Sequence, residues 1–306
     1  MGYIQLTFRC LLSATLLFIS GLSLAQVTHP ITDRAIVLYQ EGDLMAARDV
    51  VLEAVQSAAE KEIAYAWFVK GFIFKEIYKQ IEKANPYSEN RELAVEAIER
   101  SLELDALEEH KENNLKALSY IATTYYNDAV KLTKSLSYDN IDEPIVFFEK
   151  YKALDAVANP GKSYIQQDVE IFMNLGKGCR LIYEKDMEQN VAYFDLVVEF
   201  YKKALELNPE EYSANHNLAI NLYNRGVFKI RKINHNTEIF ELISIQEECV
   251  IYFKRSLPWM LKANELNENR EETVKGILAI YRSLSNEEQA MFYEDQLELI
   301  LKNGGE

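Results

Sequence analysis

The chain has 306 residues, of which 48% are hydrophobic and 26% are charged, with only 11 Gly and 6 Pro. This composition excludes a disordered chain and disfavours an all-β domain with many tight turns, so it predicts a folded, helix-rich protein. The formal net charge of −15 disfavours nucleic acid and anionic membrane surfaces as general partners.

The first 25 residues differ from the rest. They hold a single charged residue, Arg9, followed by an apolar run that ends in small side chains of the kind that a signal peptidase requires. We therefore predict a signal peptide over residues 1–25, cleaved after Ala25. The mature chain would be exported, either periplasmic or secreted, with no membrane insertion after cleavage. An uncleaved membrane anchor is the alternative, although the apolar run is short for a spanning helix.

The remaining chain holds 32 basic and 48 acidic residues, because residues 1–25 contain one Arg and no Asp or Glu. It divides into segments whose apolar residues recur at spacings of three and four, as in amphipathic helices. These segments form six consecutive pairs, and Gly42-Asp43 is expected to form the turn inside the first. The positions that mark the two helices of each pair are Ala35 and Ala54, Trp67 and Ser101, Leu118 and Ala153, Phe172 and Ala204, Leu218 and Ala263, and Val274 and Ala290.

The stretch from residue 200 to residue 226 shows the pattern most clearly. Its first half reads Y-x2-A-L-x-L-x-P, and Asn208 precedes the proline, which predicts the end of a helix there. Its second half contains L-A-x2-L, and Gly226 is expected to end that helix as a left-handed C-cap. The stretch resembles tetratricopeptide (TPR) repeats, whose pattern is W-x2-L-G-x2-Y, then A-x3-F, then a proline.

The resemblance implies an all-α fold, an α-α superhelix in the form of a TPR-like right-handed solenoid of about six helix pairs, of an exported bacterial type with enlarged repeats. Successive second-helix positions are 47, 52, 51 and 59 residues apart, against 34 in a standard repeat. The added segments fall at equivalent places, so we expect them to project from one edge as loops or longer helices. Residues 239–251 are expected to be extra helix.

The connection at Asn159-Pro160-Gly161 is the best candidate for a break between two groups of pairs. We predict N-terminal helix pairs over residues 26–156. The C-terminal pairs, with a polar capping helix at the end, are predicted over residues 157–306.

No catalytic, nucleotide-binding or metal-binding motif occurs, so we expect no enzyme activity, cofactor or metal. Gly176-Lys177-Gly178 resembles part of a phosphate loop, but it lies within a helical pattern, and close helix packing explains the glycines better. Cys179 and Cys249 lie in apolar helical contexts. We predict buried free thiols there, with a disulfide as the alternative.

The resemblance also implies where a partner binds, because the first helices of TPR pairs line the concave face. When the groove positions of TPR repeats are matched to this sequence one by one, the groove is aromatic in its N-terminal half and basic in its C-terminal half. The aromatic half suits apolar side chains, and the basic half suits a carboxylate or an acidic peptide. The alternative is that these side chains pack against added segments or only keep the helices soluble. The expected groove residues are Tyr65, Phe68, Phe72, Tyr126, Lys177, Arg180, His216, Tyr223, Lys275 and Arg282.

Three functions remain open at this point. The favoured hypothesis is a protein–protein interaction scaffold or adaptor of the bacterial cell envelope, which binds a protein or peptide in the groove and does not bind nucleic acid. The second is a structural subunit of an envelope assembly that uses the edge or convex surface. The third and least favoured is an all-α enzyme that uses Glu170 and Glu272, the only acidic groove candidates.

Overall fold

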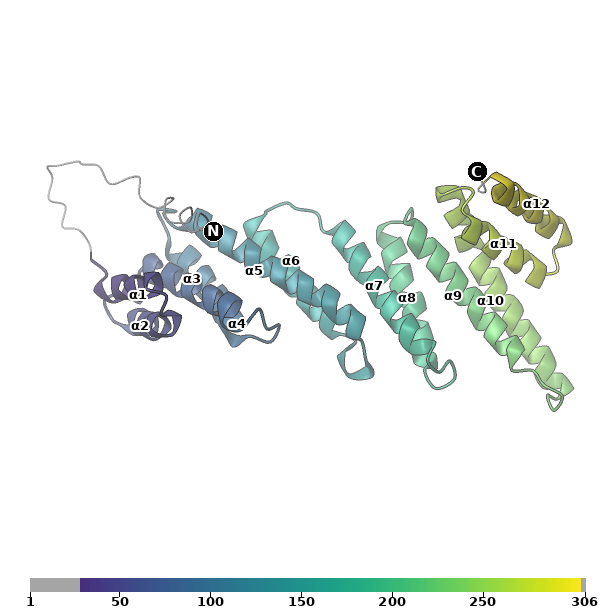
Figure 1. Cartoon of the computed structure of the whole chain (residues 1–306), viewed down its shortest axis with the longest axis horizontal. Coiled ribbons are helices and arrows are strands. Elements are labelled where there is room, and N and C mark those ends of the chain that lie inside the picture. Colours follow the sequence, from purple (N-terminus) through teal and green to yellow (C-terminus); the bar gives the residue numbers. More distant parts are fainter. Residues whose placement is uncertain (1–27, 304–306) are drawn as a thin grey trace, which may run out of the picture.

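A computed structural model describes residues 28–303, and the predicted signal peptide lies outside them. Within this range there are twelve α-helices and two 3-10 turns and no strand (Figure 1). None of these helices combines the length and apolarity that crossing a bilayer requires. The helices are α1 Pro30–Gln40, α2 Leu44–Gln56, α3 Ala64–Gln80, α4 Glu89–Leu104, α5 Lys111–Leu132, α6 Glu143–Ala158, α7 Ile165–Tyr183, α8 Val191–Leu207, α9 Tyr212–Arg231, α10 Ile239–Leu266, α11 Glu271–Ser283 and α12 Glu287–Asn303, and the 3-10 turns are η1 Thr133–Ser135 and η2 Tyr138–Asn140.

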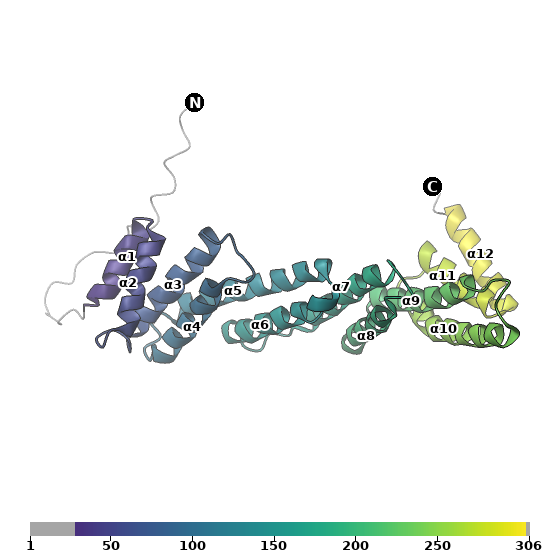
Figure 2. The same cartoon turned by 90° about the horizontal axis from the view of Figure 1, so that it is seen from below.

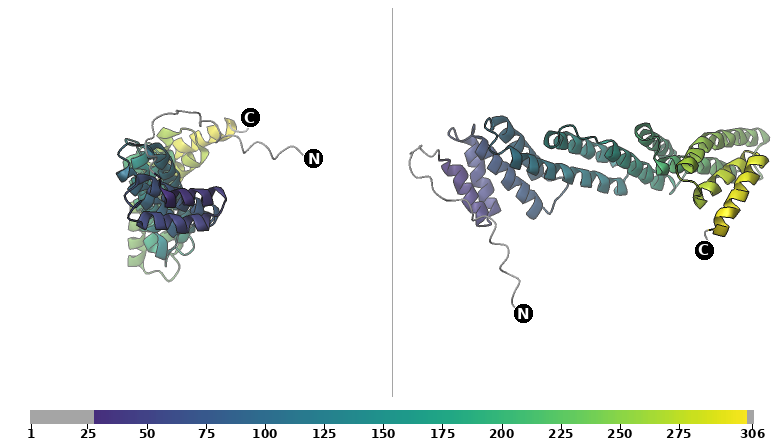
Figure 3. Two further views of the ribbon diagram at one scale, coloured as in Figure 1. Left: turned by 90° about the vertical axis from the view of Figure 1, so that its left-hand side faces the viewer. Right: turned by 90° about the horizontal axis from the view of Figure 1, so that it is seen from above.

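Each odd-numbered helix packs against the helix that follows it, and the six resulting pairs stand side by side in a long row (Figures 1 and 2). The row is much longer than it is wide, as the end-on view shows (Figure 3). The prediction of an all-α chain of six helix pairs is confirmed, and with it the resemblance to TPR repeats at the level of the fold.

Local sequence sets where the helices begin and end. Gly42 takes a φ of 86°, a left-handed conformation that glycine adopts without strain, and forms the turn predicted between α1 and α2. Asp43 caps α2 by accepting a hydrogen bond of 3.0 Å from the Ala46 amide. Helix α8 ends at Leu207, immediately before Asn208-Pro209, as predicted.

Gly226 does not end a helix, so the prediction of a C-cap there is wrong. Helix α9 continues to Arg231, and Gly226 is buried within it against α10. A Cβ atom at this position would lie 2.6 Å from the Phe253 ring. The glycine therefore serves close helix–helix approach instead of chain reversal. Gly176 has the same role in α7, where a Cβ would lie 3.1 Å from the Tyr201 ring.

The residues added to the standard repeat lengthen helices and also form loops. The connections of the third, fourth and fifth pairs lie along one edge of the row, as predicted, and form its lower edge in Figure 1. The fifth pair is the largest, because α10 has 28 residues and begins at Ile239, where extra helix was predicted. This pair extends beyond its neighbours at that edge (Figure 1).

The buried residues form a large core that runs from α1 to α9, a smaller core shared by α9, α10 and α11, and a third small cluster between α2 and α3. The predicted boundary between residues 156 and 157 lies in the last turn of α6, and the larger core includes residues on both sides of it. Buried Asp155 anchors the connection to α7 by accepting hydrogen bonds from Asn159 at 2.8 Å, Lys162 at 2.6 Å and Tyr164 at 3.1 Å. The division into two groups of pairs stays a prediction.

Two further predictions concern cysteines and the last helix. Cys179 and Cys249 are buried free thiols, as predicted, and burial raises the pKa of Cys179 to about 12. Helix α12 is less polar on its outside than predicted, because Met291 and Phe292 are exposed together with its carboxylates.

Candidate functional site

An array of half-buried rings lies at the N-terminal end of the row, and we call it the aromatic surface. Helix α3 contributes three of its members because Tyr65, Phe68 and Phe72 recur at spacings of three and four. The Phe68 ring stacks on the His110 ring at 4.9 Å, and the Tyr65 ring lies 5.6 Å from the same imidazole. The complete aromatic surface consists of His29 and Tyr39 from the start and end of α1, Tyr65, Phe68 and Phe72 from α3, and His110 before α5.

A small apolar pocket opens on this surface between α1 and α3. Its volume is about 170 Å³. Tyr39 meets Phe72 edge-on at 5.4 Å. The Lys75 ammonium lies 4.2 Å from the centre of the Phe72 ring and pairs with Glu76 at 2.7 Å. The pocket therefore has the size of one side chain, and the cation beside it already has a carboxylate partner. Its lining residues are Ile36, Tyr39, Gln40, Phe68, Val69, Phe72 and Ile73.

Tyr126 lies further along the row, on α5, and is not part of the aromatic surface. Its hydroxyl donates a hydrogen bond to Glu170 of α7, and its ring packs 5.1 Å from that of Tyr151. Burial and then the Glu170 carboxylate raise the pKa of Tyr126. This residue links the third and fourth pairs.

The predicted basic residues of the C-terminal half are mostly paired with carboxylates. Arg180 pairs with Glu184 at 2.8 Å, Arg282 pairs with Glu294 at 2.6 Å, and Lys275 pairs with Glu271. Lys177 is exposed on α7, and no ion pair forms at it within residues 28–303. The positive charge at these positions is therefore smaller than the sequence indicates.

Tyr223, Lys275 and Arg282 line a common pocket between α9, α11 and α12, with a volume of about 550 Å³. The Tyr223 hydroxyl lies 3.4 Å from that of Ser283. His216 lies earlier on α9 and meets the Thr273 hydroxyl at 3.2 Å, and burial lowers its pKa. The structure thus brings three predicted residues together here.

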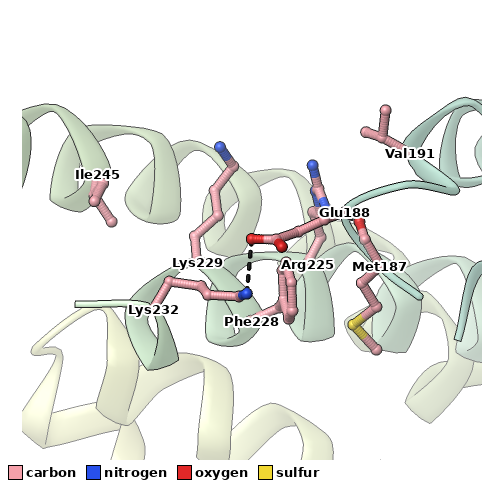
Figure 4. A pocket seen from close by; sticks show the side chains of 8 residues that line it. All are labelled: Met187, Glu188, Val191, Arg225, Phe228, Lys229, Lys232 and Ile245. Carbon is pink, nitrogen blue, oxygen red and sulfur yellow. Dashed lines mark hydrogen bonds and ion pairs between the residues drawn. The ribbon is translucent and has the colours of Figure 1, made fainter. Parts of the chain in front are cut away.

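Another pocket, which sequence reasoning missed, lies at the edge of the row between the α7–α8 connection and the α9–α10 pair (Figure 4). We call it the edge pocket, and its volume is about 320 Å³. A usable signal was present, because residues 225–237 carry four Lys or Arg and no Asp or Glu in a strongly acidic chain. The lining residues are Met187, Glu188, Val191, Arg225, Phe228, Lys229, Lys232 and Ile245.

Glu170 and Glu272 do not form a pair of free carboxylates. Glu170 lies on α7 and accepts the bond from Tyr126, whereas Glu272 lies on α11 and pairs with Arg270. Within residues 28–303, no group of three or more His, Cys, Asp or Glu side chains is placed to hold a metal ion.

No family model matches the sequence, and no curated protein matches it. Several solved structures resemble the chain. PilW, a widely conserved type IV pilus biogenesis factor, is 18% identical, with 90% of this chain and 93% of PilW covered and a TM-score of 0.31. YrrB, a TPR protein with an unusual peptide-binding site, is 15% identical over 82% of this chain and 91% of its own, with a TM-score of 0.32. A human IFIT1 dimer with m7Gppp-AAAA is 16% identical over 87% of this chain and 58% of its own, with a TM-score of 0.34. The function proposed below is argued from the chain's own residues.

Proposed function

We propose that this protein is a non-catalytic interaction scaffold of the bacterial cell envelope that binds an extended segment of a protein or peptide partner through the aromatic surface. The observation that carries the proposal is the pocket between α1 and α3, which is bordered by half-buried Tyr39, Phe68 and Phe72. Large rings that are partly exposed together provide contact area at a low cost in side-chain entropy, and such residues dominate binding interfaces.

The contacts on this surface indicate what the segment contains. An apolar side chain of the partner fits the pocket, since its volume is about 170 Å³ and its lining is almost entirely apolar. Lys75 beside Phe72 is already paired with Glu76 at 2.7 Å, so we expect the partner's contacts here to be mainly apolar. The signal peptide predicted over residues 1–25 supports a location outside the cytoplasm, in the periplasm or secreted.

Selection of binding peptides from a random displayed library, on the immobilised full-length chain, tests this function. We expect enrichment of peptides with a large apolar residue, and Phe72→Ala should weaken their binding roughly 10- to 30-fold, the loss typical of a central interface residue. Phe240→Ala is the matched control, because Phe240 is an exposed phenylalanine in the first turn of α10, away from the aromatic surface.

Two measurements separate lost binding from lost folding. Far-UV circular dichroism and the urea midpoint should be close to wild type for both variants. Equal binding by wild type and a well-folded Phe72→Ala variant would contradict the proposal. It would then favour the second function, a structural subunit that uses the edge, for which the edge pocket is the specific observation.

A further inference from the structure

Arg225 is a half-buried cation without a carboxylate partner among the described residues. Its guanidinium donates to the Tyr183 hydroxyl at 3.0 Å and to the Met187 carbonyl at 3.1 Å, and these acceptors carry no charge. Its Nε atom is buried and has no hydrogen-bond acceptor within residues 28–303. Removing a charged group from water without a counter-charge is costly, so this arrangement is incomplete by itself.

Aromatic rings enclose the guanidinium without neutralising it. The guanidinium carbon lies 5.5 Å from the centre of the Phe194 ring and 5.7 Å from those of Tyr183 and Phe228. Ring faces attract cations, but only weakly in comparison with a carboxylate in direct contact. The rings also exclude water from one side, which strengthens the interaction with any anion that approaches from the edge pocket.

The charges around the edge pocket leave room for one anion. Lys229 pairs with Glu248, and Lys232 pairs with Glu188 at 2.7 Å. Backbone hydrogen bonds and then the charge of Lys232 lower the pKa of Asp186, a further carboxylate in the α7–α8 connection. Arg225 is therefore the one cation of the pocket lining without a carboxylate partner among the described residues. The Glu188 side chain is 62% exposed and that of Lys232 is 51% exposed. Such a surface pair contributes little stability, and a ligand can replace it readily.

The rest of the pocket is apolar. Figure 4 shows Phe228 and Met187 beside Arg225, with Val191 and Ile245 at the two ends of the opening. A volume of about 320 Å³ lies at the lower end of the range for ligand pockets. It suits a small group that combines one negative charge with several apolar carbon atoms.

We propose that the edge pocket binds a monocarboxylate that carries an apolar group. The carboxylate would lie beside Arg225 and Lys232 in the place that Glu188 now takes, and the apolar group would lie against Val191, Phe228 and Ile245. A monoanion matches the single unpaired positive charge, whereas a doubly charged phosphate exceeds it and has no use for the apolar lining. A guanidinium forms strong hydrogen bonds with a carboxylate, and the Nη2 atom of Arg225 is left for one because Nη1 makes both bonds described above.

The same chemistry has two sources. One is a free short-chain carboxylic acid, and the other is an acidic or carboxy-terminal residue of a partner protein that docks at this edge. Because the edge pocket lies on the fourth and fifth pairs and the aromatic surface on the first two pairs and the start of the third, binding at one site can fail while the other is retained.

Calorimetric titration of the full-length protein with hexanoate, hexanamide and inorganic phosphate tests the site. We expect saturable binding of hexanoate with a dissociation constant on the order of 1 mM, as befits a ligand of this size. Hexanamide and phosphate should bind at least about 10-fold more weakly. A pair of short peptides that end in leucine, one with a free carboxylate and one amidated, then distinguishes the sources. Tighter binding of the free-acid peptide than of hexanoate identifies a partner segment, and the reverse identifies a small molecule.

Surface variants decide the assignment without disturbing the fold. Lys232→Met should weaken hexanoate binding several-fold, and Glu188→Gln should strengthen it several-fold because the competing carboxylate is removed. Lys302→Met, at a similarly exposed ion pair on α12, is the control and should have no effect. Methyl resonances of Val191 and Ile245 should shift during the titration. Equal binding of hexanoate and hexanamide, or unchanged affinity in both pocket variants, would overturn the proposal.

Discussion

Two arginines hold the connection between the helices of a pair, and they differ in one counter-charge: Arg91 of α4 holds that of its own second pair, and Arg225 of α9, in the fifth pair, holds that of the fourth. Arg91 is fully buried, and it donates to the hydroxyl of Tyr78 near the end of α3 at 3.3 Å and to the carbonyl of Pro86 in the connection that follows. Arg225 likewise donates hydrogen bonds to the hydroxyl of Tyr183, the last residue of α7, and to the carbonyl of Met187 in the connection that follows.

The difference lies in what neutralises the two guanidinium groups. Asp128 of α5 accepts from Arg91 at 2.6 Å, and the Tyr125 ring covers the guanidinium carbon at 3.8 Å. Arg225 has rings at longer distances, 5.5 to 5.7 Å, and it opens into the edge pocket. Arg91, with its counter-charge, therefore stabilises the α3–α4 connection and leaves no charge for a ligand. Arg225 holds the α7–α8 connection in the same way but keeps a positive charge that a ligand can neutralise.

The largest expected effect comes from removing the counter-charge of the buried arginine. Asp128→Asn leaves Arg91 charged and enclosed, which should lower the free energy of unfolding by about 3–5 kcal/mol. The measurement is the urea midpoint followed by circular dichroism.

Glu248→Gln is the matched control, because Glu248 pairs with Lys229 at the exposed edge and its side chain is 47% exposed. Its expected cost is at most about 1 kcal/mol. If both variants lowered the urea midpoint equally, the buried counter-charge of Arg91 would matter no more to stability than an exposed ion pair, and the contrast with Arg225 would fail.

A smaller effect is expected from giving Arg225 the counter-charge that it lacks. Val191→Glu introduces a carboxylate on the wall of the edge pocket. This change should weaken hexanoate binding at least about 10-fold, or about 1.4 kcal/mol, and leave the urea midpoint close to that of wild type. Val191→Gln has a similar size and no charge, so it should retain most of the affinity. Equal losses in both variants would indicate steric blocking instead of charge competition.

Much of the fold could be predicted because its signals are local. Spacings of three and four mark the helices, Gly42-Asp43 marks a turn, and Asn208-Pro209 marks a helix end. Gly226 shows the limit of such reasoning. A glycine near the end of an apolar run suits both a C-cap and a close helix contact, and the partner that decides between them, Phe253, lies 27 positions further along the chain.

The candidate sites depend still more on distant contacts. The sequence indicated the aromatic character of α3, but His110 joins the aromatic surface from another pair. The edge pocket could not be predicted because it forms where α9 packs against the α7–α8 connection, and its residues Arg225 and Met187 are 38 positions apart in the sequence. The sequence also does not show which charged side chains pair with each other. Three basic residues therefore seemed more available to a ligand than their ion pairs allow: Arg180, Lys275 and Arg282.

The smallest expected effects concern pH, and they separate the two ends of the row. Beside Arg91, burial raises the pKa of Glu92, but hydrogen bonds from Lys150 at 2.5 Å and Tyr125 at 2.6 Å outweigh it and lower the pKa overall. On the helix of Arg225, burial lowers the pKa of His216. Both groups bind protons more readily when unfolded, so both contributions to stability are present at high pH and decrease as the pH falls.

The pH windows differ because the ordinary pKa values differ, 6.5 for His and 4.5 for Glu. The chain has two tryptophans, Trp67 in α3 and Trp259 in α10, so Trp67→Phe and Trp259→Phe leave one reporter at each end. Between about pH 7 and about pH 5.5, the urea midpoint reported by Trp259 should fall while that reported by Trp67 changes less. Near pH 4 both should fall. His216→Gln should remove the first step and retain the second. A Trp259 midpoint that stays constant down to about pH 5.5 would mean that His216 is as accessible to protons in the folded protein as in the unfolded chain.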